Sequence, residues 1–233
     1  YFPDPAFASL RSGGGITMSQ TRAVIDPATG QKKAHLGTKS LVYAVADRGT
    51  PLHEAVHAYC SQTFGTQGPT WFAEGVAELG HYWRDKDLSV AIDPGVLRYL
   101  QTARPPALAE IVDPRQQSGD SWQNYAWRWA LCHLLAFTPN YSARFRPLGL
   151  DILHEGRQSF PSVYGSMLPE IDFEYRLFLE TLDTGCRVDL CSWDWKTKAI
   201  VPRGSSLVQS KIVAGRGWQA SRLSAQKDKT YQY

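Results

Sequence analysis

The sequence predicts an α+β fold, and three observations support this prediction. Extended patterns fill residues 1–49, helical patterns fill residues 50–185, and short strand patterns return in residues 186–233. The chain has 233 residues, of which 43% are apolar and 20% are charged, and this composition suits a sizeable globular core. We therefore expect a main domain over 1–185. The part after it, 186–233, is either a β-rich C-terminal extension or the start of a further module.

The N-terminal segment carries strand and turn patterns. The stretch "GGGITMS" is a glycine-rich entry to a strand. "TRAVIDPATGQ" predicts a strand followed by a turn at Pro27 to Gly30. "SLVYAVA", from Ser40 to Ala46, is a β-branched and aromatic run with the length of a buried strand.

Two helices follow this segment. "DRGTP" interrupts the strand pattern, and we expect Thr50 to cap a helix with Pro51 at its first position, where a missing N–H has no consequence. This helix is predicted to reach Thr63. "GTQGP" then turns the chain, and a second helix is expected from Thr70 to Trp83.

The remainder of the main domain reads as helical. The clearest helix spans Ser121 to Phe137, with aromatic and leucine residues at helical spacing. We expect "LPEIDFEYRLFLETLDTG" to form a later helix closed by Gly185. Further helices are predicted for "PGVLRYLQ", "ALAEIV" and "SARFRPLGLDILHEG", and short strands for "CRVDLCSWDWKTKAIV", "SLVQSKIV" and "GRGWQAS".

Charge and hydropathy exclude some classes of partner. The net charge is +3 and no dense block of Lys and Arg is present, so nucleic acid is a poor candidate partner. No apolar run reaches the ~18–20 residues that cross a bilayer, so we expect no membrane span. The oligomeric state is left open.

The four cysteines bear on the cellular location of the protein. Cys60 and Cys132 fall in predicted helices, where we expect buried free thiols. Cys186 and Cys191 are close enough in sequence for a local disulfide. That possible bridge, and an opening that resembles a mature or excised fragment, favour an extracytoplasmic or secreted protein, although the localisation stays open.

The stretch "TPLHEAVHAYC" carries metal-binding chemistry. His53 and His57 lie one helical turn apart, so their imidazoles can bind the same tetrahedral cation. Glu54 lies beside them and can take a proton from water at that cation. The alternative is an amphipathic helix with two half-exposed histidines.

A second stretch, "WFAEGVAEL", strengthens the metal hypothesis. Glu74 follows His57 after a turn that can fold one helix against the other, and it supplies the third ligand of a His₂Glu zinc site. Glu78 lies on the same face and can accept the second N–H of a liganding histidine. The surrounding residues are small or apolar, unlike those of a solvated helix face.

Together, "HEAVH" and "WFAEGVAE" resemble motifs of the gluzincin metallopeptidases, the superfamily that includes thermolysin and the aminopeptidase-N group. The resemblance is closest to bacterial peptidase-MA-like domains and covers residues 10–183. It implies a small N-terminal sheet with a mainly helical half. It also implies Zn²⁺ on His53, His57 and Glu74, Glu54 as catalytic base, and a peptide or protein substrate.

The oxyanion donor is less defined. In the aminopeptidase group a tyrosine opens a later helix, and "NYAWRWALCHLL" places Tyr125 in that position. A phenol O–H can donate to a tetrahedral oxyanion. A structural role for Tyr125 stays open, and His133, His81 and Tyr82 are alternative donors.

One departure from the aminopeptidase pattern narrows the activity. That group uses an upstream glutamate to hold the substrate's amino terminus, and this chain has no glutamate before Glu54. "GGGITMS" is the nearest counterpart and can form an edge strand that pairs with a peptide. We expect a zinc endopeptidase rather than an aminopeptidase. The alternative is a zinc-site domain of little or no activity that acts as a binding or scaffold module.

Overall fold

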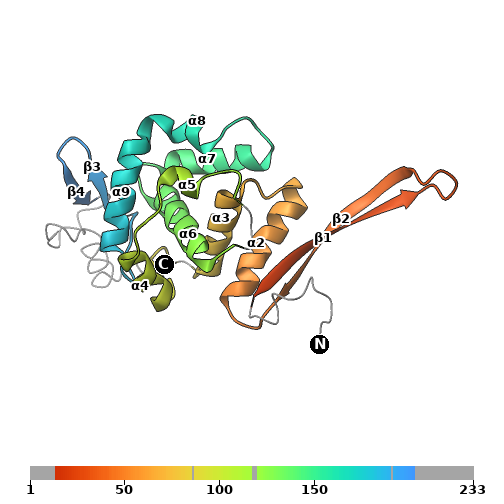
Figure 1. The fold of residues 1–233 in the computed structure, drawn as a ribbon, viewed down its shortest axis with the longest axis horizontal. Helices are drawn as coiled ribbons and strands as arrows, with labels where there is room; N and C mark the ends of the chain where they lie inside the picture. The colour runs from red at the N-terminus through yellow and green to blue at the C-terminus, as the bar shows by residue number, and fades with distance from the viewer. Residues whose placement is uncertain (1–13, 86, 117–119, 190, 203–233) are drawn as a thin grey trace.

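The computed structural model describes residues 14–85, 87–116, 120–189 and 191–202. This part of the chain consists of an N-terminal hairpin, a helical body and a second, short hairpin (Figure 1). Both hairpins are antiparallel. The predicted α+β class is therefore confirmed.

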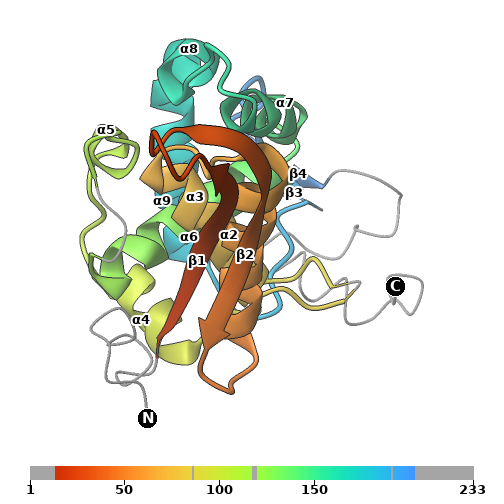
Figure 2. The same ribbon diagram turned by 90° about the vertical axis from the view of Figure 1, so that its right-hand side faces the viewer.

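The first hairpin joins β1 (Gly15–Ile25) and β2 (Lys32–Ala44). Its inner half lies on α2 (Gly49–Phe64) and its outer half projects away from the body (Figures 1 and 2). The strand predicted from Ser40 to Ala46 is present, but the prediction that it is buried is wrong. Residues Ser40 to Ala44 form the end of β2, and Val42 among them is 39% exposed.

Helix α2 begins two residues before the predicted first position, Pro51, and this changes its cap. The predicted capping role of Thr50 is wrong, since Thr50 lies inside the first turn. Its N–H and hydroxyl both donate to the carboxylate of Asp47, each at 2.7 Å. Pro51 also lies in the first turn, where its lack of an N–H leaves no intrahelical bond unmade.

Helix α3 (Thr70–His81) packs between α2 and α6 (Trp122–Phe137). Gly75 makes the approach of α3 to α6 possible. A Cβ at Gly75 would lie 2.4 Å from Cys132 Sγ and 2.8 Å from the Arg128 carbonyl oxygen, both closer than ordinary contact. The glycine costs helix propensity, but it lets the backbone next to Glu74 lie directly against α6.

The other helices complete the body. The prediction that Gly185 closes the last helix is wrong, because that helix ends four residues earlier and the Gly185 N–H donates to the Val90 carbonyl at 2.7 Å. The short helix at 160–164 was not predicted. It begins with a capping box between Ser159 and Ser162. The remaining elements are α4 (Pro94–Thr102), α5 (Leu108–Ile111), α7 (Ser142–Leu153), α8 (Phe160–Tyr164), the 3₁₀ helix η2 (Gly165–Met167) and α9 (Leu168–Thr181).

The second hairpin pairs β3 (Cys191–Asp194) with β4 (Ala199–Pro202), as predicted for this stretch. It packs on α9, where Trp195 Nε1 donates to Glu174 Oε1 at 2.9 Å. The strands predicted for "SLVQSKIV" and "GRGWQAS" lie outside the described residues.

Cys60 and Cys132 are buried free thiols, as expected. The side chain of Cys191 lies outside the described residues, so the Cys186–Cys191 disulfide stays a prediction. Among the helices that the structure describes, none is long and apolar enough to cross a membrane.

Candidate metal centre

Helices α2 and α3 bring three ligand-type side chains together. His53 and His57 extend from successive turns of α2, and their Nε2 atoms lie 3.0 Å apart. Glu74 of α3 places its Oε2 3.3 Å from each of these nitrogen atoms. The three residues are 8%, 7% and 2% exposed, respectively. Residues predicted from separate motifs therefore converge on one buried point.

The spacing of these atoms fits a metal ion. In a tetrahedral site with bonds of about 2.0–2.1 Å, neighbouring ligand atoms lie about 3.3 Å apart. The three observed separations, 3.0, 3.3 and 3.3 Å, match the edges of such a tetrahedron. The buried group of His53, His57 and Glu74 can hold a metal ion.

The charge of the site also favours a cation. Burial by itself lowers the pKa of His53, but hydrogen bonds and charges from Glu74 and Glu78 outweigh burial and raise that pKa to about 9. A proton on His53 thus compensates the buried carboxylates when no metal ion does. A divalent cation at the same point would replace that proton.

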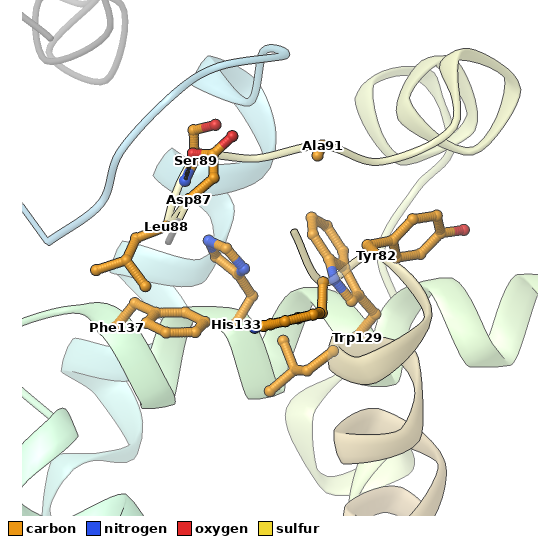
Figure 3. A pocket seen from close by; sticks show the side chains of 10 residues that line it. Tyr82, Asp87, Leu88, Ser89, Ala91, Trp129, His133 and Phe137 are labelled. Carbon is orange, nitrogen blue, oxygen red and sulfur yellow. Dashed lines mark hydrogen bonds between the residues drawn. The ribbon is translucent and has the colours of Figure 1, made fainter. Parts of the chain in front are cut away.

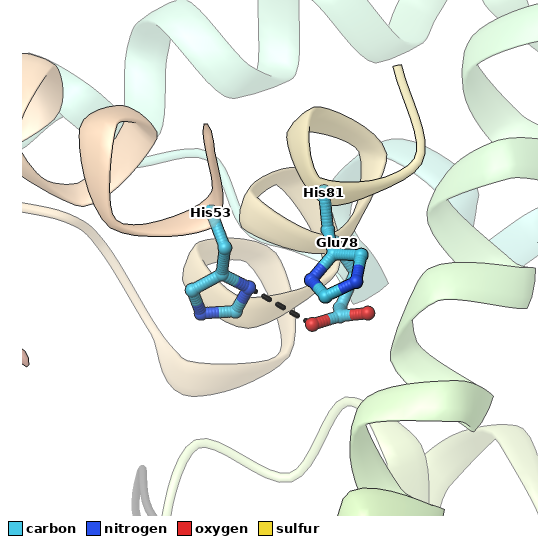
Figure 4. Close-up of side chains that lie close together, drawn as sticks. All are labelled: His53, Glu78 and His81. Carbon is cyan, nitrogen blue, oxygen red and sulfur yellow. Dashed lines mark ion pairs between the residues drawn. The ribbon is translucent and has the colours of Figure 1, made fainter. Parts of the chain in front are cut away.

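Glu78 contacts His53 at the ring nitrogen that does not face Glu74 and His57. Its Oε1 accepts from His53 Nδ1 at 2.9 Å (Figure 4). This contact leaves Nε2 of His53 facing Glu74 and His57. His81 joins His53 and Glu78 in a second group with metal-ligand spacing. The two groups share His53, and only the first is buried throughout.

Glu54 belongs to neither group, but on α2 it directly follows His53, the residue that both groups share. It is 7% exposed. Its Oε2 and its own carbonyl oxygen lie 2.7 and 2.9 Å from the hydroxyl of Thr17 on β1. The candidate base is therefore in contact with the N-terminal hairpin.

Tyr125 reaches the same region from the first turn of α6. Its ring centroid lies 5.9 Å from that of His53. The guanidinium of Arg128 lies 5.6 Å from the centre of the Tyr125 ring. Arg128 is only 1% exposed, and it pairs with both oxygens of Asp120 at 3.0 and 2.7 Å. Tyr125 thus lies close to both His53 and the buried guanidinium of Arg128.

The alternative oxyanion donors are placed differently. His81 has its ring centroid 6.4 Å from that of His53. Tyr82 packs on Trp129, and burial, with the charges of Glu78 and Asp93, raises the pKa of its phenol. His133 stacks on Phe178 in the core, where burial lowers its pKa to about 3.

Tyr82 and His133 both line a small pocket of about 50 Å³ between α3, α6 and residues 87–91 (Figure 3). In the described structure, no recorded contact joins His133 to the metal-ligand group. Of the four candidates, Tyr125 and His81 are the two whose rings approach His53.

Sequence reasoning missed Thr17 and Arg128. Thr17 lies within the quoted stretch "GGGITMS", but a threonine in a strand is common and carries no sign of a partner 37 residues away. Arg128 lies in an aromatic helix, where a single arginine normally faces solvent. The contact with Glu54 identifies Thr17, and burial together with pairing identifies Arg128. None of these properties can be read from local sequence.

No protein-family model, no curated protein and no solved structure matches the chain. The functional argument therefore rests on the site itself. Its geometry shows a buried His₂Glu group that can hold a metal ion, with a glutamate and a tyrosine beside it.

Proposed function

We propose that this protein is a zinc-dependent peptidase that cleaves peptide bonds by water attack. The observation that carries the proposal is the convergence of His53, His57 and Glu74 at tetrahedral spacing, from helices that also present Glu54. Two imidazoles and one carboxylate form the ligand set of catalytic zinc sites, and they leave one position for water or substrate. When bound, zinc supplies a Lewis acid and lowers the pKa of water.

Glu54 has the properties of a general base. It follows the first ligand directly in sequence, and its carboxylate is held against β1 by Thr17. In the proposed reaction Glu54 accepts a proton from the attacking water and then delivers it to the leaving amine nitrogen. A buried carboxylate in a fixed orientation suits both transfers.

Tyr125 and β1 supply the oxyanion donor and the substrate-binding strand of the proposed active site. The Tyr125 phenol can donate a hydrogen bond to the developing oxyanion. Strand β1 belongs to a two-stranded sheet and contacts Glu54, so a substrate backbone can add to this sheet beside the base. A substrate that binds through its backbone needs no free amino terminus, which favours endopeptidase activity.

A second candidate function is a zinc-binding scaffold with little turnover. The observation that favours it is the burial of the site, since His53, His57, Glu54 and Glu74 are each less than a tenth exposed. A peptide must reach these groups for catalysis, whereas a structural cation needs no access. Retention of Glu54 favours the enzyme, because a structural zinc site requires no base.

One experiment separates these functions. Purified protein is analysed for zinc and then incubated with a mixed peptide library, as wild type and as Glu54→Gln. A peptidase binds zinc in both forms and cleaves only as wild type. Bound zinc with equal inactivity of both forms supports the scaffold, and the absence of zinc from both contradicts both functions.

A further inference from the structure

Strand β1 contacts the Glu54 side chain through two residues. Gly15 and Thr17 are two positions apart, so they face the same side of the strand. In the β1–β2 register they oppose Ala44 and Val42. Both face α2, and both meet Glu54 there.

Gly15 provides the space that the Glu54 side chain occupies. A Cβ at Gly15 would lie 2.6 Å from Glu54 Cγ and 2.7 Å from Glu54 Oε1. It would also lie 2.9 Å from Thr50 Cγ2. The strand backbone therefore limits the side chain of Glu54 on one side, and any larger residue at Gly15 would displace it.

Thr17 provides the polar contact. Its hydroxyl lies 2.7 Å from Glu54 Oε2 and 2.9 Å from the Glu54 carbonyl oxygen. A hydroxyl has one proton to donate, and the charged carboxylate oxygen is the stronger and closer acceptor. Thr17 thus holds one carboxylate oxygen while Gly15 limits the position of the other.

We propose that Thr17 is a positioning residue that fixes the carboxylate of Glu54 for proton transfer. The inference rests on the proposed peptidase function for its catalytic consequence, but the contact itself does not depend on that function. The hydrogen bonds of the Thr17 hydroxyl go to Glu54 and not to His53, His57 or Glu74. It acts through Glu54.

The location of this contact on β1 links the orientation of Glu54 to the binding of substrate. The same strand is available to pair with a peptide backbone, so its position determines both where substrate lies and how Glu54 is oriented. Removal of the Thr17 hydroxyl should therefore lower the rate of the chemical step more than it affects substrate binding.

The first test is kinetic and uses matched variants. Thr17→Val removes the hydroxyl at nearly constant volume and suits a strand. Thr17→Ser keeps the hydroxyl. Thr102→Val removes a threonine hydroxyl outside β1, at the end of α4, where Thr102 Oγ1 donates to the Arg98 carbonyl at 2.8 Å. We expect Thr17→Val to lower kcat by about tenfold to a hundredfold at similar KM and zinc content, as for other supporting contacts. Thr17→Ser and Thr102→Val should stay within about twofold of wild type.

The second test needs neither zinc nor activity. Metal-free protein is labelled with ¹³C at the glutamate carboxyl groups, and the Glu54 resonance is identified by its loss in Glu54→Gln. We expect this resonance to shift in Thr17→Val and to keep its position in Thr17→Ser and Thr102→Val. An unchanged Glu54 resonance in Thr17→Val would overturn the proposed contact.

The two tests separate failure of this inference from failure of the proposed function. An active wild type with Thr17→Val at wild-type kcat contradicts the positioning role, and so does an equal loss in Thr17→Ser. Inactivity of zinc-loaded wild type contradicts the peptidase function. The carboxyl resonance then still decides whether Thr17 fixes Glu54.

Discussion

Substitution of Gly75 by alanine tests whether the packing of α3 on α6 sets the geometry of the metal centre. The added Cβ would lie 2.4 Å from Cys132 Sγ and 2.8 Å from the Arg128 carbonyl oxygen. Ordinary contact begins at 3.4 Å, so α3 must move by about 1 Å relative to α6. Because Glu74 is the preceding residue, it should move with the helix.

The expected cost combines two opposing effects. Overpacking of a tight contact costs about 1–3 kcal/mol, while replacing glycine by alanine in a helix regains about 0.5–1 kcal/mol. The free energy of unfolding should therefore fall by about 1–2 kcal/mol, which lowers Tm by about 2–8 °C for a chain of this size. A movement of about 1 Å exceeds the tolerance of about 0.2 Å for metal–ligand distances, and zinc affinity should fall at least about tenfold.

Thermal unfolding and chelator competition measure these two quantities. Gly165→Ala is the matched control, since a Cβ at Gly165 meets no atom within 4 Å. It should raise Tm slightly, through the same gain of about 0.5–1 kcal/mol, and leave zinc affinity unchanged. If Gly75→Ala also keeps wild-type zinc affinity, the close packing of α3 on α6 does not determine the site.

Three further outcomes follow from the contacts of the site. Asp120→Ala leaves the buried Arg128 guanidinium without its charged partner and should cost about 3 kcal/mol in urea unfolding, whereas Asp172→Ala breaks an exposed pair with Arg176 and should cost less than about 1 kcal/mol; equal costs would contradict the argument. Glu78→Ala removes the partner of His53 Nδ1 and should weaken zinc binding about tenfold to a hundredfold, with Glu78→Gln affected less. The pKa of His53 is raised to about 9, so below that pH zinc must displace a proton from His53. Zinc affinity should therefore rise about tenfold per pH unit from pH 7 and level off above pH 9. This stabilising proton is fully present below pH ~6.5 and lost as pH rises through about 9, so a pH-independent affinity would argue against His53 as a ligand.

The helices that carry the site could be predicted because their signals are local. The spacing of His53 and His57 requires only helical periodicity, and "GTQGP" marks the turn before Glu74. The residues around Glu74 on α3 are small or apolar, and α3 packs against both α2 and α6. The convergence of the three side chains therefore follows from two motifs and one turn.

Helix ends and long-range partners could not be predicted in the same way. Thr50 and Asp47 are both suitable caps, and the choice depends on where the hairpin before α2 ends. The Thr17–Glu54 contact depends on the register of β1 against β2 and on the docking of that hairpin on α2. Arg128 is buried because Asp120 and Gln116 fold back over it, which a helical pattern cannot reveal.

Anomalous diffraction at the zinc edge, from crystals grown with one equivalent of zinc, tests the central claim most directly. We predict one strong peak within about 2.0–2.3 Å of His53 Nε2, His57 Nε2 and a Glu74 carboxylate oxygen. A peak on His53, Glu78 and His81 would instead assign the cation to the second group of ligand-type residues. That result, or the absence of a peak at both groups, would contradict the proposed zinc centre.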